Sequence, residues 1–308
     1  MTPEFLVAIV FAIVLVATPI LLAGLGELVV EKAGVLNLGV EGMMLIGAVT
    51  GFAVTSLSGS PYLGVLAAAV AGALVSMIFA VLTLTLSANQ VATGLALTIF
   101  GGGFSALAGK AFLGKTVVAF TQLFPTELAT HPIWRVIFGY SPLVYFSLFM
   151  CAAIAWFLRR TRAGLILRAV GENDLSAHSI GYSVIGVRYM AVAFGGAMAG
   201  VAGSMFSLVL TPIWAEGLTA GRGWIALALV VFSAWKPFRL LLGAYIFGAV
   251  MTLEVHAKAA GGVFSALPSE FWAALPYLAT IIVLGVISLR RSSSGAPACL
   301  GRPFIPPA

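Results

Sequence analysis

The sequence predicts an all-α polytopic membrane protein with about nine transmembrane helices, some of them short or broken. Of its 308 residues, 61% are hydrophobic and only 8% are charged, whereas about a quarter of the residues of a soluble domain are charged. Its mean hydropathy is +1.11. Apolar stretches of about 20 residues, long enough to cross a bilayer, follow one another closely. We therefore expect a multi-pass protein of the cell membrane.

The predicted membrane segments share high apolar content and are separated by short polar stretches. They are residues 5–25, 34–54, 62–86, 90–108, 141–158, 189–210, 223–235, 240–254 and 271–289. The first has no basic residues before it and is too long for a cleaved signal, so we expect it to stay in the protein. We expect residues 1–291 to form one transmembrane domain. Residues 292–308, rich in serine and proline, are expected to be a disordered cytoplasmic tail.

Glycines interrupt several of these segments, most densely 34–54 and 90–108. Such breaks persist at membrane depth only where protein or a water-filled cavity satisfies the backbone. They indicate either a transport pathway or close helix packing. In the segment 189–210, Gly196-x-x-x-Gly200 and Ala199-x-x-x-Gly203 place small residues four apart, and this spacing favours close packing of two helices.

The basic residues predict the orientation in the membrane. Arg159, Arg160, Arg162, Arg168 and Arg188 lie in one loop, and Arg290 and Arg291 follow the last segment. Basic residues concentrate on the cytoplasmic side, so we expect the N-terminus outside, the loop 109–140 outside and the C-terminus inside. The same bias explains the net charge of +6 without a nucleic-acid partner.

Two motifs that suggest other chemistry do not fit their surroundings. Residues 109–116, Gly-Lys-Ala-Phe-Leu-Gly-Lys-Thr, match a phosphate-binding loop, but that loop functions between a strand and a helix. Here a glycine-rich membrane segment precedes it, on the predicted outer side, so we expect no ATPase in this chain. Cys151 and Cys299 are far apart in sequence and indicate neither a disulfide framework nor a metal site. No cofactor is expected.

Polar residues within apolar segments are candidates for the translocation pathway. Glu41 is expected about a third of the way along an apolar helix, where a charge is costly. It either belongs to the pathway or is a structural carboxylate bonded to a broken helix end. Short polar side chains lie near the predicted cytoplasmic helix ends and either bind solute or tie broken helices together; they are Asn37, Asn89, Gln90 and Thr93. Arg222 and Trp224 are expected near the outer face, where membership of an interfacial aromatic belt is the alternative explanation for the tryptophan. The candidates are Asn37, Glu41, Asn89, Gln90, Thr93, Arg222 and Trp224.

The longest cytoplasmic stretch, Arg159–Arg188, predicts a short helix along the membrane surface. Asn173 or Asp174 is a suitable N-cap, and Gly181 is a suitable C-terminal stop. Such a helix either forms a binding surface for a soluble partner or docks on lipid headgroups. These residues alone do not separate the two interpretations.

Four blocks resemble a known family. Thr161–Gly181 resembles the coupling loop of ABC permeases in the large family that includes ribose and branched-chain amino acid importers. Glu31–Ala48, Asn89–Gly94 and Gly221–Ala228 are similar to the nucleoside-type branch of that family. Sugar permeases of the family usually carry Asp-Leu-Ser-x-Gly where this chain has Asn-Leu-Gly-Val-Glu-Gly. The family pattern would have proline after Gly-Glu-Asn, where this chain has Asp174; either residue can open a helix.

The resemblance implies a permease that takes up nucleosides or related purine compounds. Its implied partners are a second permease (a paralogue or a copy of itself), a cytoplasmic ATPase subunit and an extracytoplasmic substrate-binding lipoprotein of the basic-membrane-protein type. The permease itself would have no catalytic residues. Ala177 would offer the ATPase a small contact face. The residues implied for the coupling loop are Arg168, Gly171, Glu172, Asn173, Asp174, Ala177 and Gly181.

Three alternatives stay open at this point. An ABC permease for simple sugars or another small polar solute would share most of these features. An ion-coupled secondary transporter would need several acids within the membrane, and only Glu41 is expected to lie deep. An intramembrane enzyme fits worst, because the three histidines and Asp174 all fall in predicted loops.

Overall fold

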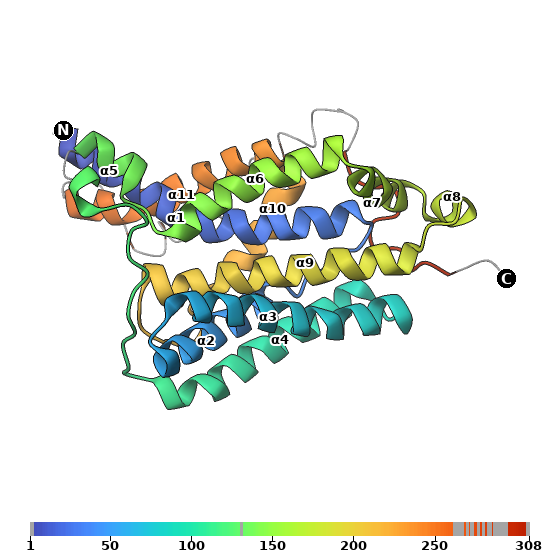
Figure 1. Ribbon diagram of the computed structural model, residues 1–308, viewed down its shortest axis with the longest axis horizontal. Coiled ribbons are helices and arrows are strands. Elements are labelled where there is room, and N and C mark those ends of the chain that lie inside the picture. The colour runs from blue at the N-terminus through green and yellow to red at the C-terminus, as the bar shows by residue number, and fades with distance from the viewer. Residues whose placement is uncertain are drawn as a thin grey trace.

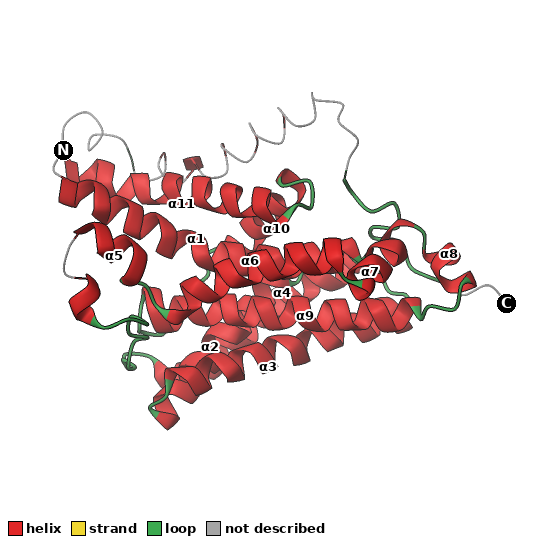
Figure 2. Ribbon diagram, turned by 45° about the horizontal axis from the view of Figure 1, so that its top comes forward, coloured by secondary structure: helices red, strands yellow, loops and turns green. Residues whose placement is uncertain are grey.

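A computed structural model describes residues 3–129, 132–260 and 295–305, with isolated positions between 261 and 294. In these residues the protein is helical, and the only strand-like feature is one bridge between Thr116 and Ile213. Figure 2 shows the described residues as helices joined by loops, and Figure 1 shows the start of α1 and the C-terminal segment 295–305 at opposite ends of the long axis. The predicted all-α class is confirmed.

Among the described residues, six helices are long and apolar enough to cross a membrane, and two shorter helices are apolar as well. The six are α1 (Pro3–Lys32), α2 (Val40–Ser58), α3 (Pro61–Ala80), α4 (Gln90–Gly109), α6 (Pro142–Arg160) and α9 (Val184–Met205); π-helical turns Val81–Thr85 and Phe206–Leu210 extend α3 and α9. The shorter ones are α10 (Arg222–Phe232) and α11 (Pro237–Ala260). These match the first eight predicted segments. The ninth, 271–289, lies outside the described residues except for isolated positions.

The remaining elements lie at the two ends of the molecule. One end carries α5 (Pro132–Phe138) with the 3₁₀ turns Lys110–Phe112 and Thr126–Ala129. The other carries α7 (Arg162–Glu172), α8 (Asp174–Ser179) and the C-terminal segment (Figure 1). We call these the α5 end and the α8 end. The predicted outer loop 109–140 and the predicted cytoplasmic loop are therefore at opposite ends of the molecule.

Helix α9 is the centre of the bundle and packs against α1, α2 and α3. Its small residues allow this: a Cβ on Gly200 would collide with the carbonyl of Ala68 in α3, and one on Gly203 with the carbonyl of Met44 in α2. A Cβ on Gly47 of α2 would likewise collide with the backbone of Gly200. The packing role predicted for the small-residue motifs of α9 is confirmed, and close backbone approach accounts for much of the glycine content.

The region 33–39 differs from its predicted structure. The sequence predicts a membrane segment over 34–54, but α2 begins only at Val40 and the preceding residues are irregular. Gly34 has φ +88°, a left-handed conformation that favours glycine and ends the helical run from α1. Glu41 consequently lies in the first turn of α2 and not a third of the way along a helix. We call residues 33–39 the α1–α2 break.

The C-terminal segment 295–305 also differs from the expected disordered tail. The amide of Cys299 donates to the carbonyl of Gly171 (2.9 Å), and that of Gly301 to the carbonyl of Gly34 (3.1 Å). Phe304 is buried against Val170 and Val184. Composition favours disorder here, yet one aromatic anchor and a row of backbone bonds hold the segment in place. Both cysteines, Cys151 and Cys299, are free thiols.

The orientation stays a prediction that thiol labelling can check. Cysteines introduced at Thr126, near α5, and at exposed Ser179, in α8, lie at opposite ends of the molecule. In a Cys299→Ser background, a membrane-impermeant maleimide added to intact cells should label the Thr126→Cys variant. It should leave the Ser179→Cys variant unlabelled until the cells are opened. The reverse pattern would invert the assigned orientation.

Candidate translocation and coupling sites

Glu41 caps the N-terminus of the short helix α10. One carboxylate oxygen accepts hydrogen bonds from the Thr219 hydroxyl (2.5 Å) and the Gly221 amide (2.8 Å), and the other from the Gly223 amide (2.6 Å). The first amides of a helix have no partner within the helix and carry the positive end of its dipole. Glu41 therefore has the geometry of the structural alternative, a carboxylate bonded to a broken helix end. Its role in transport stays a prediction.

Arg222 and Trp224 lie deeper than the sequence predicts. They flank Gly223 and so sit beside Glu41, in the first turn of α2 and far from the outer end of that helix. The Arg222 guanidinium carbon lies over the ring of Phe206, 4.9 Å from the ring centroid. The physical reason is length: α10 has 11 residues, or about 16 Å, and cannot span a hydrocarbon core of about 30 Å. The Glu41 cap therefore places the start of α10 beside the first turn of α2.

A tight turn brings the chain to that depth. Ala220 and Gly221 both have left-handed φ values, +46° and +78°, so the segment after α9 reverses sharply into α10. Non-glycine residues rarely adopt this conformation, and where it persists the surroundings must enforce it. Here the Glu41 carboxylate bonds to residues on both sides of Ala220.

A second carboxylate holds the other end of α10. Ala234 and Trp235 form another left-handed pair, with φ +49° and +56°. The indole N–H of Trp235 donates to the carboxylate of Glu31 in α1 (2.5 Å). Glu31 is buried. Helix α10 is therefore a half-helix held by acids at both of its ends.

Sequence reasoning missed Glu31 and its neighbour Glu27 as buried groups. The first segment was predicted to end at residue 25, whereas α1 continues to Lys32 and both acids are buried. A signal was available, since two acids four residues apart lie on one face of a helix directly after an apolar run. The Glu27 carboxylate accepts a hydrogen bond from the backbone N–H of Asn37 (3.1 Å).

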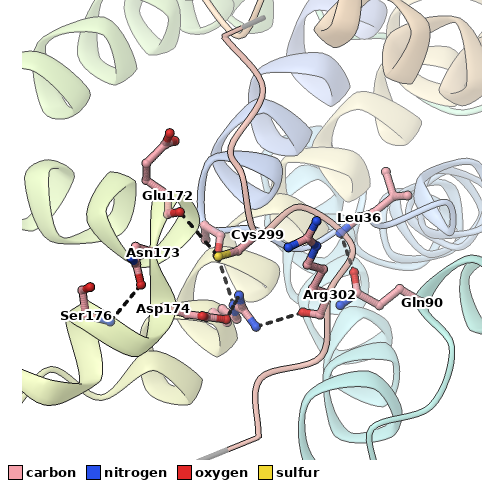
Figure 3. A network of polar contacts seen from close by, with 10 residues as sticks. Leu36, Gln90, Glu172, Asn173, Asp174, Ser176, Cys299 and Arg302 are labelled. Atoms are coloured by element: carbon pink, nitrogen blue, oxygen red, sulfur yellow. Dashed lines mark hydrogen bonds and ion pairs between the residues drawn. The ribbon is translucent and has the colours of Figure 1, made fainter.

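Polar side chains satisfy the backbone of the α1–α2 break. The Leu36 amide donates to the side chain of Gln90 (2.8 Å; Figure 3). The Leu38 carbonyl accepts from the Thr98 hydroxyl (3.0 Å), and the Asn37 side chain accepts from the Gly39 amide (2.9 Å). Irregular backbone in a membrane requires such partners. Asn37 and Gln90, both buried, have the geometry of residues that tie broken helices together.

The other two candidates lie at the start of α4. Asn89 is exposed and caps α4 by accepting from the Ala92 amide (3.0 Å). Thr93 lies one turn further on and is half-buried. The structure therefore brings Asn37, Glu41 and Gln90 to one polar junction with the start of α10, and places Asn89 and Thr93 at its edge.

The predicted helix in the coupling loop is present as α8. Asn173 is its N-cap, and its side-chain oxygen accepts from the Ser176 amide (2.9 Å; Figure 3). Gly181 follows the helix with φ +94°, as expected of a glycine stop. A further helix, α7, precedes α8. Thr161 caps it by accepting from the Gly164 amide (3.0 Å), and this helix was not predicted.

The exposed surface of α7 and α8 differs from the expected contact face. Gly171 and Ala177 are buried inside this chain: a Cβ on Gly171 would collide with the Lys32 carbonyl, and Ala177 packs with Val170 and Phe304. Neither can present a face to a partner. Arg168, Glu172 and Asn173 are exposed. So are three apolar side chains that sequence reasoning missed, Leu165 (59%), Leu175 (54%) and Ile180 (71%).

Two other features do not add a solute or nucleotide site. A groove of about 730 Å³ between α6, α7 and α9 is lined by apolar residues such as Met150, Phe157 and Phe194, with Ser183 at its edge. A lining of that kind cannot replace the hydration of a polar solute. The phosphate-loop pattern begins where α4 ends and continues as a 3₁₀ turn. No strand precedes it, so it lacks the context of a nucleotide loop.

Comparison with known proteins identifies the family. Residues 9–284 match the family described as branched-chain amino acid transport system / permease component. The chain belongs to this permease family. It is a multi-pass membrane protein of the cell membrane, and the relatives below are transport permeases, not enzymes.

Three curated relatives align along nearly their whole length. The chain is 38% identical to the putative glucose ABC transporter permease protein TsgC13 of Haloferax volcanii, over 94% of each chain. It is 32% identical to the guanosine ABC transporter permease protein NupQ of Bacillus subtilis, over 98% of each. It is 30% identical to the nucleoside ABC transporter permease protein NupC of Lactococcus lactis, over 90% of this chain and 91% of the relative.

Proposed function

We propose that this chain is the membrane-spanning permease subunit of an ABC importer for nucleosides or related purine compounds. One observation carries the proposal: the blocks that resemble the nucleoside-type branch meet at a single junction. Glu41, in the first block, caps the helix that begins in the last block, at Gly221–Gly223. Gln90, in the middle block, bonds to Leu36 in the first. Two relatives named for guanosine and nucleosides support this substrate class.

The fold supports a mechanism in which the permease moves and a partner hydrolyses ATP. In membrane transporters, half-helices with broken ends commonly form the solute site, and the surrounding helix bundles rock around it. Helix α10 is such a half-helix, with a left-handed pair at each end. Its ends are fixed by hydrogen bonds to Glu41 and Glu31, not by long helical continuations. A small shift of α1 or α2 would therefore reposition α10 as one piece.

Three partners complete the proposed importer. A cytoplasmic ATPase subunit would bind α7 and α8 at the α8 end, where Leu175 of α8 and its C-cap residue Ile180 are exposed. A second permease, either a paralogue or a copy of this chain, would share the membrane. An extracytoplasmic substrate-binding lipoprotein would deliver the solute at the α5 end. The assignment of each partner rests on the family and on the position of these surfaces.

Glucose is the second candidate substrate, because a relative at 38% identity is named as a putative glucose permease. Against it, this chain has Asn37-Leu-Gly-Val-Glu41-Gly in place of the sugar-permease pattern. In this structure Glu41 of that block is the cap of α10, so the difference from the sugar-permease pattern falls on a residue at the centre of the junction.

Uptake measurements separate the two substrates. Cells that lack the chain and cells that express it with its ATPase and binding protein should be given radiolabelled guanosine, adenosine or glucose. We expect the chain to restore uptake of the two nucleosides and an excess of unlabelled glucose to leave that uptake unchanged. Restoration of glucose uptake alone would assign the chain to sugar transport.

A further inference from the structure

We infer that Arg188 is the positioning residue that joins the coupling helices to the α1–α2 break, with the C-terminal segment 295–305 closing this junction. The inference rests on the proposed function, because it concerns how movement of α7 and α8 reaches the membrane interior. The sequence placed Arg188 in the cytoplasmic loop. The structure instead places it in the second turn of α9, completely buried.

The guanidinium of Arg188 bonds to three separate parts of the chain. Its Nη2 donates to the carboxylate of Asp174, the first residue of α8 (3.1 Å). Its Nε donates to the carbonyl of Ala33 in the α1–α2 break (3.2 Å), and its Nη1 to the carbonyl of Arg302 (3.3 Å). Figure 3 shows Asp174 and the Arg302 carbonyl bonded to the same group. Helix α8, the break and the C-terminal segment therefore share one cation.

This cation is held rigidly. A guanidinium is planar and always charged, and its donors point in fixed directions, so three acceptors fix its position. A buried charge that loses its partner is costly. Asp174 is only 14% exposed at its side chain, so the pair is shielded from water and salt. A displacement of Asp174 must therefore move Arg188 or break the pair.

The C-terminal segment fastens the same parts a second time. The Cys299 amide bonds to the Gly171 carbonyl at the end of α7, and the Gly301 amide to the Gly34 carbonyl in the break. Lys32 donates to the Gly295 carbonyl (2.7 Å). Two backbone hydrogen bonds and one from the Lys32 side chain thus hold the end of α7, the break and the end of α1 to the same segment. Without the segment, the Arg188 guanidinium would also lose its third acceptor.

A continuous set of contacts leads from this junction to α10. Ala33, which accepts from Arg188, begins the break. The break ends at Gly39, and Glu41 in the next turn caps α10. Asn37, between them, is fixed to Glu27 of α1. Movement of α8 can therefore reach α10 through bonded groups. Adjacency alone does not establish coupling, so the test must measure transmission.

At Asp174 the chain departs from the pattern that the family resemblance implies. The family pattern would have proline at this position, and proline has no carboxylate to pair with Arg188. Both residues open a helix equally well, so the need for an N-terminal helix residue does not explain the aspartate. The pair with a buried arginine does.

The test uses the assembled complex of this chain with its ATPase and a thiol reporter far from the junction. Glu216 is exposed in the segment between α9 and α10. A Glu216→Cys variant in a Cys299→Ser background would report movement at that point through its rate of maleimide labelling. We expect ATP to change this rate. In Asp174→Asn and Arg188→Met variants, the change should fall to less than about one fifth of that in the parent.

Further variants separate transmission from folding. Deletion of residues 295–308 should also reduce the ATP-dependent change. Arg302→Ala should not, since it retains the backbone carbonyl and its side chain is exposed. The double variant Asp174→Asn/Arg188→Met should be no worse than either single variant, as expected for one interacting unit. A general folding defect would instead lower the amount of complex, and the losses seen in the two single variants would add in the double variant.

An unchanged ATP response in Asp174→Asn would overturn the inference. So would a parent complex in which ATP leaves the labelling rate unchanged, because no movement would then be transmitted. These outcomes are independent of the substrate. A parent that responds to ATP but takes up no nucleoside would contradict the proposed function and leave the role of Arg188 intact.

Discussion

Replacement of Glu41 by alanine is expected to abolish uptake and to reduce the amount of folded protein in the membrane. The change removes the acceptor for the Thr219 hydroxyl and for the Gly221 and Gly223 amides. Each buried donor left unsatisfied costs about 1–3 kcal/mol, and no water is present in the hydrocarbon core to replace the carboxylate. The turn at Ala220, with φ +46°, would also lose the group that holds it.

Matched variants make this experiment specific. Glu216→Ala removes an exposed carboxylate from the segment that precedes α10 and should leave uptake unchanged, as should Glu4→Ala near the N-terminus. Thr219→Val removes one of the three bonds and should have an intermediate effect, about 1 kcal/mol. Protein level by immunoblot and nucleoside uptake should be measured together. Full uptake by normally expressed Glu41→Ala would exclude Glu41 both as an essential cap and as a pathway group.

The second large effect is expected at the exposed apolar surface of α8. The double variant Leu175→Glu/Ile180→Glu should abolish recovery of the ATPase with the permease and abolish uptake, while membrane abundance stays normal. Leu175 and Ile180 are 54% and 71% exposed, so the change removes no core packing of this chain. Apolar side chains that lie in the core of a protein interface commonly dominate its binding energy, and charges placed there cannot be desolvated without cost.

A control distinguishes partner binding from a general charge effect. Arg239→Glu alters an exposed residue at the start of α11 and should leave ATPase recovery intact. Gly171→Val and Ala177→Arg are poorer probes, because both positions are buried against this chain's own residues and a loss of function would not separate docking from folding. If the Leu175/Ile180 double variant still recovers the ATPase, the apolar surface of α8 contacts lipid headgroups instead.

Local chemistry explains what could be predicted from the sequence. Apolar runs of membrane length located α3, α6 and α9, because lipid imposes that composition and length directly. Asn173 and Gly181 marked the ends of α8, since caps act through neighbouring atoms in the sequence. The small residues of α9 indicated packing for the same reason: their spacing on one helix face is a local property.

The features that depend on distant partners could not be predicted. The depth of Arg222 and Trp224 follows from the cap by Glu41, a residue about 180 positions away in the sequence. Nothing near Arg188 in the sequence indicates that Asp174, Ala33 and Arg302 will surround it. A basic residue after a basic loop is typical of a solvated charge, and only tertiary structure shows that it is buried.

The order of segment 295–305 was missed for a related reason. The serine and proline content of the whole tail 292–308 is typical of disorder, but the order of 295–305 comes from acceptors supplied by Gly34 and Gly171 and from a pocket for Phe304. Those acceptors become available only once the α1–α2 break and α7 have formed.

The central claim is that an ATPase at the α8 end drives uptake through this chain, and transport into proteoliposomes tests it most directly. The complex of the permeases and the ATPase should be reconstituted with the binding protein and labelled guanosine outside. We predict accumulation of guanosine only when ATP is enclosed on the side that carries α7 and α8, and no accumulation with a proton or sodium gradient alone. Accumulation driven by an ion gradient without ATP would contradict the account and indicate a secondary transporter.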